Sequence, residues 1–332
     1  MSFQNEPLVS VLTPVYNGED FLVDCIESVL NQTYQNYEYI IVNNCSKDRT
    51  LEIARDYAKK DRRIRIQDNA RFVDVIENHN IAFGLIAEAA KYCKVVSADD
   101  FISPTCIEKL VLCAESNPSV GIVGCYQLSG SKVRWQGFKY PVSVFPGRDV
   151  CRRVFLEGQP DFGFGTPTSL LYRADLVRQS PLFYPNPSPH SDTSACFRDL
   201  QKCDFGFVYE ILSFERTHGE TQTSKSTDMN RYSSAYLNDL IEYGPAYIGT
   251  IEVDRLAKVQ LNEYYRFLAV NRLFRSRGKE FWNYHRTRLE ELGHPLKGFW
   301  FLRALLRTAV QEILNPKQAI RKAGRHISSK TK

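Results

Sequence analysis

The first hundred residues alternate short apolar, β-branched runs with segments of helical periodicity, and this alternation limits the folds open to the chain. Strands are predicted at residues 8–13, 37–42, 64–67 and 93–97, and helices at residues 21–30, 47–60 and 76–90. Strands that alternate with helices favour a mainly parallel sheet with helices on both faces. The sequence therefore predicts a doubly wound, Rossmann-like α/β domain.

The pattern changes after residue 100. The sequence predicts a helix at residues 106–115, strands at residues 120–126, 169–172 and 205–209, and a helix that begins near Asp192. Residues 127–168 are rich in Gly, Pro and aromatic side chains and lack periodicity, so we expect substrate-facing loops there. From about residue 228 the pattern is helical, which predicts a C-terminal helical extension.

Composition excludes several classes of protein. With 43% hydrophobic and 24% charged residues, the chain is typical of globular proteins. The nine cysteines are scattered singly without a C-x-x-C pair, which argues against a zinc site or a disulfide framework and favours a reduced, cytoplasmic setting. The N-terminus lacks the basic start and apolar core of a signal peptide, and no stretch approaches the ~18 apolar residues of a spanning helix.

Positive charge is concentrated in the C-terminal part of the chain. Residues 255–332 contain 18 Lys and Arg against 5 Asp and Glu, whereas the preceding residues are net acidic. Residues 299–314 are strongly apolar but interrupted by arginines, and further basic residues follow at Lys317, Arg321, Lys322 and Arg325. Such a segment either lies on an anionic membrane surface or packs as a helix on the protein or a partner. Nucleic-acid binding is not expected, because no recognition motif accompanies the charge.

Three predicted strands end in loops of unusual composition. Residues 14–17 follow the first strand, residues 43–46 the second, and residues 98–100 the fourth. Ligands of open α/β sheets bind beyond the carboxyl ends of the strands, where such loops converge. The sequence therefore predicts a ligand site at this edge of the sheet.

Two adjacent carboxylates, Asp99 and Asp100, lie at the end of the fourth predicted strand. Like charges this close repel each other unless a cation or strong donors neutralise them. Mg²⁺ or Mn²⁺ held by one or two carboxylates together with substrate phosphates is common in nucleotide-diphosphate chemistry. The alternative is that one aspartate caps the helix after Ser103 and the other is solvated.

Four segments together resemble inverting glycosyltransferases of family 2. Residues 9–17, VSVLTPVYN, resemble that family's opening strand and loop, and residues 28–34, SVLNQTY, resemble the end of its first helix. Residues 96–100, VSADD, resemble its D-x-D-D segment, and residues 190–193, HSDT, fall where it carries Glu-Asp. The resemblance covers about residues 7–220 and implies the GT-A fold.

The resemblance also implies a division of the chain. The catalytic domain would span residues 1–225, with a nucleotide-binding half at about 1–126 and an acceptor-binding half at about 127–225. A basic helical extension would follow at residues 226–332. The implied partners are a nucleotide-sugar donor and a sugar or lipid-linked acceptor. A cytoplasmic enzyme, with peripheral contact to the inner face of a membrane through the basic helices, is expected.

The family's roles carry over by position. Pro14, Val15, Tyr16 and Asn17 would cradle the nucleotide, with Tyr16 offering a flat apolar face to the base or ribose, unless it is only a half-buried loop aromatic. Asp99 would hold ribose or metal and Asp100 the metal, so the pair is assigned jointly. The implied cofactor is Mn²⁺ or Mg²⁺.

Asp192 would be the general base that deprotonates the acceptor hydroxyl during a single inverting displacement. The sequence also permits a simpler role. Ser191, Asp192, Thr193 and Ser194 precede the apolar periodicity of a helix, so Asp192 alternatively serves as an N-cap.

The chain departs from the family pattern at several of these positions. Asn43 and Asn44 replace the usual aspartates of the second loop and still offer an acceptor to uracil or thymine. Ser97 replaces the first Asp of D-x-D-D, which leaves the metal to Asp99 and Asp100.

Other departures concern contacts to phosphate and acceptor. His79 and Asn80 stand where the family often has Arg-Asn and would contact the donor, although a lone His is more often a structural hydrogen-bonder. Arg216 and His218 would reach the diphosphate or are surface charges. Residues 161–166, with Phe164, Gly165 and Thr166, resemble an acceptor-facing loop whose glycines and aromatics approach a sugar.

The predicted activity is metal-dependent, inverting transfer of a hexose-type sugar from a UDP- or dTDP-sugar, in surface polysaccharide or glycolipid synthesis. A nucleotidyltransferase would need a Gly-rich, basic phosphate loop after the first strand, which residues 14–17 lack. The remaining alternative is a catalytically degenerate protein that binds a nucleotide sugar or a partner, suggested by Asn43, Asn44 and Ser97.

Overall fold

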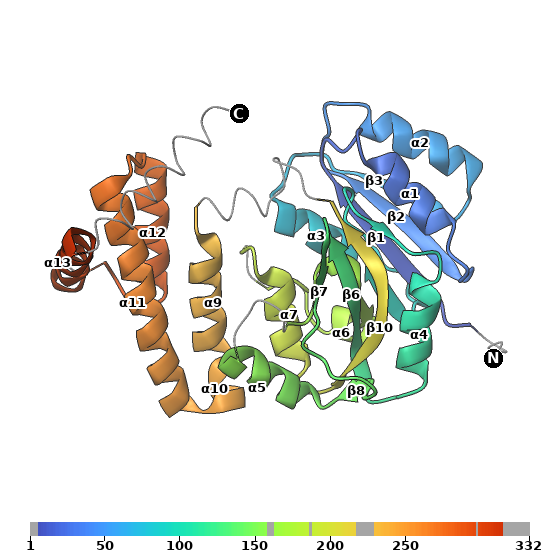
Figure 1. The fold of residues 1–332 in the computed structure, drawn as a ribbon. Helices are drawn as coiled ribbons and strands as arrows, with labels where there is room; N and C mark the ends of the chain where they lie inside the picture. Colours follow the sequence, from blue (N-terminus) through green and yellow to red (C-terminus); the bar gives the residue numbers. More distant parts are fainter. Residues whose placement is uncertain (1–5, 158–162, 186–187, 217–228, 297, 315–332) are drawn as a thin grey trace. The chain divides into compact units, whose positions relative to one another are not determined.

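The computed structural model describes residues 6–157, 163–185, 188–216, 229–296 and 298–314. The chain divides into two compact units, Met1–Ser224 and Lys225–Lys332. The first combines a central sheet with helices, and the second contains only helices among its described residues (Figure 1).

The sheet of the first unit has the strand order β3-β2-β1-β4-β9-β6-β10-β5. These strands are β1 (Val9–Val15), β2 (Tyr37–Asn43), β3 (Ile64–Asp68), β4 (Tyr92–Val95), β5 (Phe101–Ile102), β6 (Val120–Ser129), β9 (Leu170–Arg173) and β10 (Asp204–Glu215). Two short strands complete the sheet, with β7 (Lys132–Arg134) paired to β6 and β8 (Val144–Phe145) to β10. The predicted α/β class with a central sheet is confirmed.

Strand direction divides the sheet. The block β3-β2-β1-β4 is parallel throughout, as is the pair β6-β10. Between them, β9 runs antiparallel to both β4 and β6. The sheet is therefore more mixed than predicted, because the apolar pattern of a four-residue strand carries no information about its direction.

Helices cover both faces of this sheet (Figure 1). Helices α1 (Leu22–Leu30), α2 (Thr50–Lys60) and α4 (Cys106–Glu115) share one apolar core with the side of β1 that carries Val9, Val11 and Val15. The alternate residues of β1, including Leu12, face the opposite side, where α3 (Val75–Phe83) packs. Every residue of β1 is consequently buried, which explains its continuous apolar sequence.

Helix α3 is shorter than predicted, because it ends at Phe83 rather than at residue 90. Gly84 follows the last helical residue, and glycine is a poor helix former. Beyond it, the Ala87 N–H donates to Glu38 Oε1 at 2.7 Å instead of continuing a helical ladder. A side chain of β2 therefore competes with the helix for this backbone group.

Residues 127–168 contain more regular structure than the expected loops. Besides β7 and β8 they include α5 (Gly147–Glu157), and a short helix η1 (Pro167–Ser169) leads into β9. Two further helices, α6 (Ala174–Arg178) and α7 (Ser191–Asp199), complete this half of the unit. The aromatic residues that obscured the periodicity form a second core, in which Phe155 stacks on Phe197 with ring centroids 4.3 Å apart.

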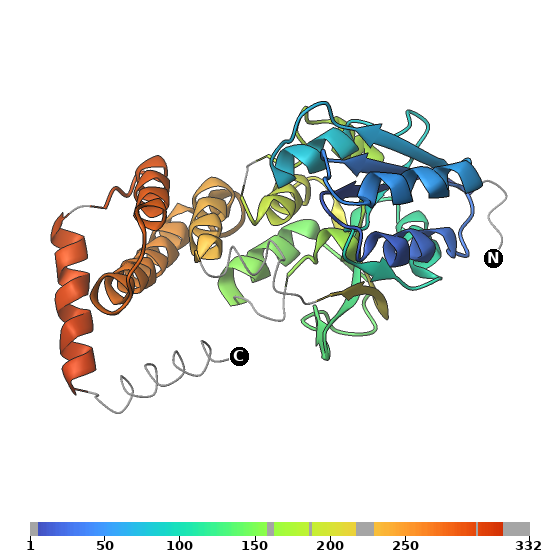
Figure 2. The same cartoon turned by 90° about the horizontal axis from the view of Figure 1, so that it is seen from above.

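The second unit contains α9 (Arg231–Glu242), α10 (Gly244–Ile248), α11 (Thr250–Phe274), α12 (Lys279–Glu291) and α13 (Gly298–Leu314). Helix α11 packs against both α9 and α13 (Figure 2). No helix in the described ranges is long and apolar enough to span a bilayer. All nine cysteines of the chain lie in described residues, and none forms a disulfide.

Candidate active site

The loops after β1 and β2 are joined by hydrogen bonds at the carboxyl ends of their strands. The Asn17 N–H donates to Ser46 Oγ at 2.9 Å, and Asn17 Oδ1 accepts from the Lys47 N–H at 2.8 Å. Asn17 has a left-handed backbone (φ 49°), which asparagine tolerates better than most residues. Because Pro14 and Val15 are buried, only Tyr16 and Asn17 of the predicted cradle present exposed side chains.

The loop after β1 also approaches the acidic pair. A Cβ at Gly18 would lie 2.7 Å from Val15 Cγ2 and 3.8 Å from Ala98 Cβ. Glycine therefore allows this loop to pack against the segment that leads into Asp99. The three strand-end loops predicted from the sequence are thus connected in space.

Tyr16 forms an aromatic pair that the sequence did not predict. Its ring lies edge-on to Phe72, with centroids 4.8 Å apart, and the two side chains are 44% and 57% exposed. Phe72 reaches this position because Asn44 clamps the neighbouring Val73, donating to its carbonyl at 2.8 Å and accepting from its N–H at 3.0 Å. The buried amide of Asn44 thus orders the loop that carries Phe72, and its predicted contact with the base stays a prediction.

Asn43 is likewise engaged by protein groups. Its Nδ2 donates to Asp68 Oδ1 at 2.7 Å, and its Oδ1 accepts from the Ser46 N–H at 3.3 Å. Asp68 ends β3 beside the end of β2, and its half-exposed carboxylate lies 3.7 Å from Arg55. The end of β2 carries an amide, Asn43, and the neighbouring end of β3 supplies a carboxylate, Asp68, beside it.

The acidic pair follows β4, and its two members differ in environment. Asp99 is half-buried, whereas Asp100 is only 6% exposed. Thr168 Oγ1 donates to Asp100 Oδ2 at 2.6 Å, accepts from the Ser97 N–H at 3.1 Å and lies 3.2 Å from Ser97 Oγ. Burial, followed by the charge of Asp99, raises the pKa of Asp100 to about 7.

Two cationic residues, Lys94 and Arg216, lie near Asp100. Lys94 is fully buried and donates to the Thr168 carbonyl and, at 3.2 Å, to the Val95 carbonyl. The Arg216 N–H donates to Asp100 Oδ1 at 3.3 Å, while its guanidinium pairs with Asp24. Arg216 therefore lies beside the acidic pair, although its charged group is turned to Asp24. His218, the other predicted phosphate contact, lies outside the described residues.

The chemistry of these groups fits a divalent cation. The raised pKa of Asp100 means that the protein stabilises its negative charge less well than water does. A cation bound beside the carboxylate would stabilise that charge. In the described part of the chain, no group of three or more His, Cys, Asp or Glu side chains is arranged to hold a metal. Two carboxylates that share a cation with substrate phosphates match this set.

His79 and Asn80 connect α3 to the segment that carries Tyr184. Asn80 makes two hydrogen bonds to the backbone of Tyr184, accepting from its N–H at 2.9 Å and donating to its carbonyl at 3.0 Å. The amide of Asn80 therefore holds this segment, and its predicted contact with the donor stays a prediction. His79 packs on Tyr184 at 5.6 Å and donates through Nδ1 to the Val75 carbonyl, and burial lowers its pKa. Its Nδ1 is thus engaged by the backbone of its own helix.

Asp192 lies in the first turn of α7 and is half-buried. The helix is capped at His190 without a side-chain hydrogen bond, and Asp192 Oδ1 accepts from the adjacent Thr193 N–H at 2.8 Å. Asp192 therefore lies inside the first turn of α7 rather than at its N-cap position. The charge of Asp192 contributes to raising the pKa of Tyr184, so the carboxylate lies near the segment held by Asn80.

The predicted acceptor loop is partly a core segment. Phe164 is buried, with its ring 5.0 Å from that of Phe197, and its predicted role in the acceptor loop stays a prediction. Gly165 has φ 137°, and a Cβ there would lie 2.4 Å from Ser169 Oγ. Thr166 is half-buried and accepts from Gln127 Nε2 at 2.8 Å. Residues 161 and 162 lie outside the described residues.

Comparison with known proteins identifies the family. The model described as Glycosyl transferase family 2 matches residues 10–180, just over half of the chain. The chain belongs to glycosyltransferase family 2. The matched range contains Tyr16, Asp68, the Asp99–Asp100 pair and Thr168, whereas Asp192 lies beyond it.

Individual relatives agree with this family 2 assignment. An uncharacterized glycosyltransferase of Haemophilus influenzae is 27% identical over 277 residues, which cover 82% of this chain and 85% of the relative. The putative teichuronic acid biosynthesis glycosyltransferase TuaG of Bacillus subtilis is 48% identical over 61 residues, 18% of this chain and 24% of TuaG. The protein is a glycosyltransferase.

The fold of this family 2 member also matches a solved structure. S. aureus TarS 1–349 in complex with UDP-GlcNAc aligns with a TM-score of 0.60 at 14% identity, covering 86% of this chain and 80% of that one. At this identity the likeness shows the shared GT-A fold. The predicted fold and family are therefore confirmed, while the roles of individual site residues stay predictions.

Proposed function

We propose that the protein catalyses metal-dependent, inverting transfer of a hexose-type sugar from a UDP- or dTDP-sugar to an acceptor hydroxyl. One observation carries the proposal: Asp100 is buried beside Asp99 at the end of β4, with its pKa raised to about 7. A diphosphate donor that brings a divalent cation to this pair would relieve the uncompensated charge.

The donor would bind across the strand-end loops. Tyr16 and Phe72 offer exposed aromatic faces to the base, and the carboxylate of Asp68 can accept the N3–H of uracil or thymine. Asp99 and Asp100 would hold Mn²⁺ or Mg²⁺, which, when bound, stabilises charge on the leaving diphosphate. Thr168 orients Asp100 by its 2.6 Å hydrogen bond.

The transfer itself would use Asp192 as general base. The Asp192 carboxylate accepts the proton of the acceptor hydroxyl while the hydroxyl oxygen forms a bond to the anomeric carbon. The bond from that carbon to the diphosphate oxygen breaks on the opposite face, and its electron pair leaves with the nucleotide diphosphate. A single displacement inverts the anomeric centre, so no covalent enzyme intermediate is needed.

The acceptor would be a sugar or a lipid-linked sugar in surface polysaccharide or glycolipid synthesis. The similarity to TuaG, a putative teichuronic acid biosynthesis glycosyltransferase, supports this setting. We propose a cytoplasmic location with peripheral contact to the inner face of the membrane. The basic residues of the C-terminal unit support that contact.

The proposal is tested by incubating the purified protein with a panel of nucleotide sugars, with and without Mn²⁺. We expect metal-dependent binding and slow hydrolysis of a UDP- or dTDP-sugar by the wild type, and loss of both in Asp100→Ala. Asp61→Ala is a matched control, because Asp61 pairs with Arg63 at the start of β3 and touches none of these loops. Donor binding that needs no metal would refute the metal-dependent mechanism, and binding without turnover on any acceptor would favour a degenerate protein.

A further inference from the structure

Helix α13 presents an apolar stripe to solvent. Phe299, Leu302, Leu306 and Val310 are 70%, 54%, 60% and 52% exposed. At about 100° of rotation per residue, these four positions fall within an arc of about 80° on one face of the helix. Soluble proteins rarely leave such a continuous apolar stripe uncovered unless it meets another surface.

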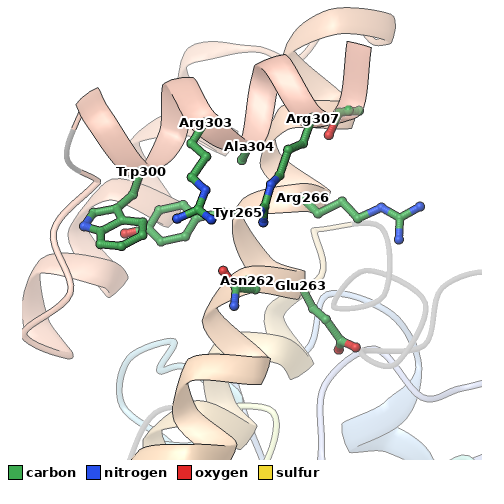
Figure 3. A pocket seen from close by; sticks show the side chains of 9 residues that line it. Asn262, Glu263, Tyr265, Arg266, Trp300, Arg303, Ala304 and Arg307 are labelled. Carbon is green, nitrogen blue, oxygen red and sulfur yellow. The ribbon is translucent and has the colours of Figure 1, made fainter. Parts of the chain in front are cut away.

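Arginines border this stripe on the side that faces α11. They line a cavity of about 230 Å³ between the two helices, formed by Asn262, Glu263, Tyr265, Arg266, Trp300, Arg303, Ala304, Arg307 and Thr308 (Figure 3). By the same rotation, Arg303 and Arg307 lie about 40° and 80° around α13 from Phe299. The charged groups therefore lie directly beside the apolar stripe.

The cavity carries excess positive charge. Arg266, Arg303 and Arg307 line it against the single acidic residue Glu263, with the side chain of Arg266 extending away from those of Arg303 and Arg307 (Figure 3). The ion pairs Arg255–Glu252 and Arg288–Glu291 of this unit use none of these three arginines. The guanidinium of Arg303 lies 5.7 Å from the ring of Trp300, which holds it at the mouth of the cavity.

We propose that α13 docks on an anionic membrane surface, with the cavity formed by Arg266, Arg303 and Arg307 binding the phosphate of a lipid headgroup. An interfacial helix buries its apolar face at the acyl boundary while arginines at the edge reach the headgroups. Guanidinium groups are well suited to phosphate, which they bind through paired hydrogen bonds. Trp300 adds an aromatic ring at the depth where tryptophan is enriched in membrane proteins.

The exposed apolar stripe favours a lipid headgroup over a soluble acidic glycan as the anion that binds the arginines. A polyanionic glycan would satisfy the arginines but would leave Phe299, Leu302, Leu306 and Val310 in water. A bilayer satisfies both. The inference deepens the peripheral membrane contact proposed above, and its test needs neither donor nor acceptor.

The experiment measures co-sedimentation of the full chain with vesicles of phosphatidylcholine alone or mixed with phosphatidylglycerol. We expect binding to the anionic vesicles only, weakened by salt. Removal of three interfacial cations in Arg266→Ala/Arg303→Ala/Arg307→Ala should lower the partition coefficient on the order of 100-fold. Leu302→Ser/Leu306→Ser should also weaken binding to anionic vesicles, because it removes apolar burial.

A control removes the same charge elsewhere. Lys60, Arg62 and Lys132 are exposed in the catalytic unit, and their triple replacement by alanine should leave vesicle binding unchanged. Helix content and thermal unfolding of each variant are checked by circular dichroism. As a measurement independent of the arginine variants, the wild-type tryptophan emission should shift to the blue when anionic vesicles are added, and Trp300→Phe should abolish the shift.

Several results would overturn the proposal. Equal binding to neutral and anionic vesicles, or equal loss in the control triple variant, would exclude a phosphate site in this cavity. Binding of inorganic phosphate or an acidic polysaccharide by the cavity without vesicle binding would assign it to a soluble ligand. Donor binding measured on the same samples separates these results from failure of the transferase proposal.

Discussion

The substitution Thr168→Val removes one hydroxyl group that donates a hydrogen bond to Asp100. Thr168 lies in η1, 68 residues after Asp100 in the sequence. In the wild type, this hydroxyl donates to Asp100 Oδ2 at 2.6 Å in a setting where Asp100 is 6% exposed. A hydrogen bond to a charged group contributes about 1.5–3 kcal/mol. Because the hydroxyl stabilises and orients the ionised carboxylate, that free energy is lost from metal binding, and Mn²⁺-dependent affinity for UDP should fall about 10- to 150-fold.

The assay is isothermal titration of UDP at one fixed, subsaturating Mn²⁺ concentration, compared among wild type, Thr168→Val and Thr168→Ser. Serine keeps the hydroxyl and should retain affinity close to that of the wild type. Valine also leaves the Ser97 N–H without its acceptor, which is expected to lower the free energy of unfolding by about 1–3 kcal/mol. Titrations are therefore made well below the unfolding midpoint of each variant.

Two results would refute this reasoning. A folded Thr168→Val protein with wild-type affinity would show that the hydroxyl does not support metal or donor binding. Equal losses in Thr168→Val and Thr168→Ser would show that the methyl group and its packing matter instead.

Three further predictions concern other parts of the molecule. Burial lowers the pKa of His285 from 6.5 to about 4. The neutral ring therefore stabilises the fold fully above pH 6.5, and about 3 kcal/mol of unfolding free energy is lost as the pH falls from 6.5 through 4. Urea unfolding between pH 7 and 4 should show a shallower pH dependence in His285→Gln than in the wild type. Asp68→Ala should weaken UDP binding about 10-fold, because it removes one hydrogen bond to the base. Unchanged affinity in an isothermal titration would exclude that contact. Asn80→Ala loses both hydrogen bonds to Tyr184 and should lower the free energy of unfolding by about 1–3 kcal/mol in chemical denaturation, whereas Asn36→Ala, at an exposed site, should change it little.

The sequence predicted the parallel half of the fold because burial leaves a direct pattern in the residues. Strands β1 to β4 are each within two residues of prediction at either end. Strands β1, β2 and β4 are buried along almost their whole length and are therefore mainly apolar, whereas the edge strand β3 alternates apolar and polar residues. The helical residues of α4 were predicted to the residue. The loops that end these strands also follow from the order of elements, which is why the edge carrying Tyr16, Asn43 and Asp99 could be located.

The parts that were missed depend on contacts between distant residues. Phe72 is brought to Tyr16 only by the clamp of Asn44 on Val73, and Thr168 reaches Asp100 only because η1 returns to the end of β4. No local pattern encodes either contact. Asp68 could have been found, because it is a carboxylate at the end of β3 and the same strand-end rule that located the other loops applies to it.

Three residues that the sequence predicts to contact a ligand are engaged by the fold itself. Asn44, Asn80 and Phe164 have side chains that suit a ligand contact, and each contacts a neighbouring segment of the protein. Both asparagines hydrogen-bond to backbone groups of a neighbouring segment, and Phe164 fills the aromatic core beside Phe197. Sequence type alone does not distinguish an amide that binds a ligand from one that orders a loop.

The measurement that tests the central claim most directly compares donor affinity with transfer rate in Asp192→Asn. If Asp192 is the general base at a site whose donor is held elsewhere, the rate of sugar transfer should fall about 10²- to 10⁴-fold while the dissociation constant for the nucleotide sugar stays near the wild-type value. Circular dichroism would verify that the variant folds as the wild type does. Parallel loss of donor binding and transfer, or transfer at the wild-type rate, would contradict the account.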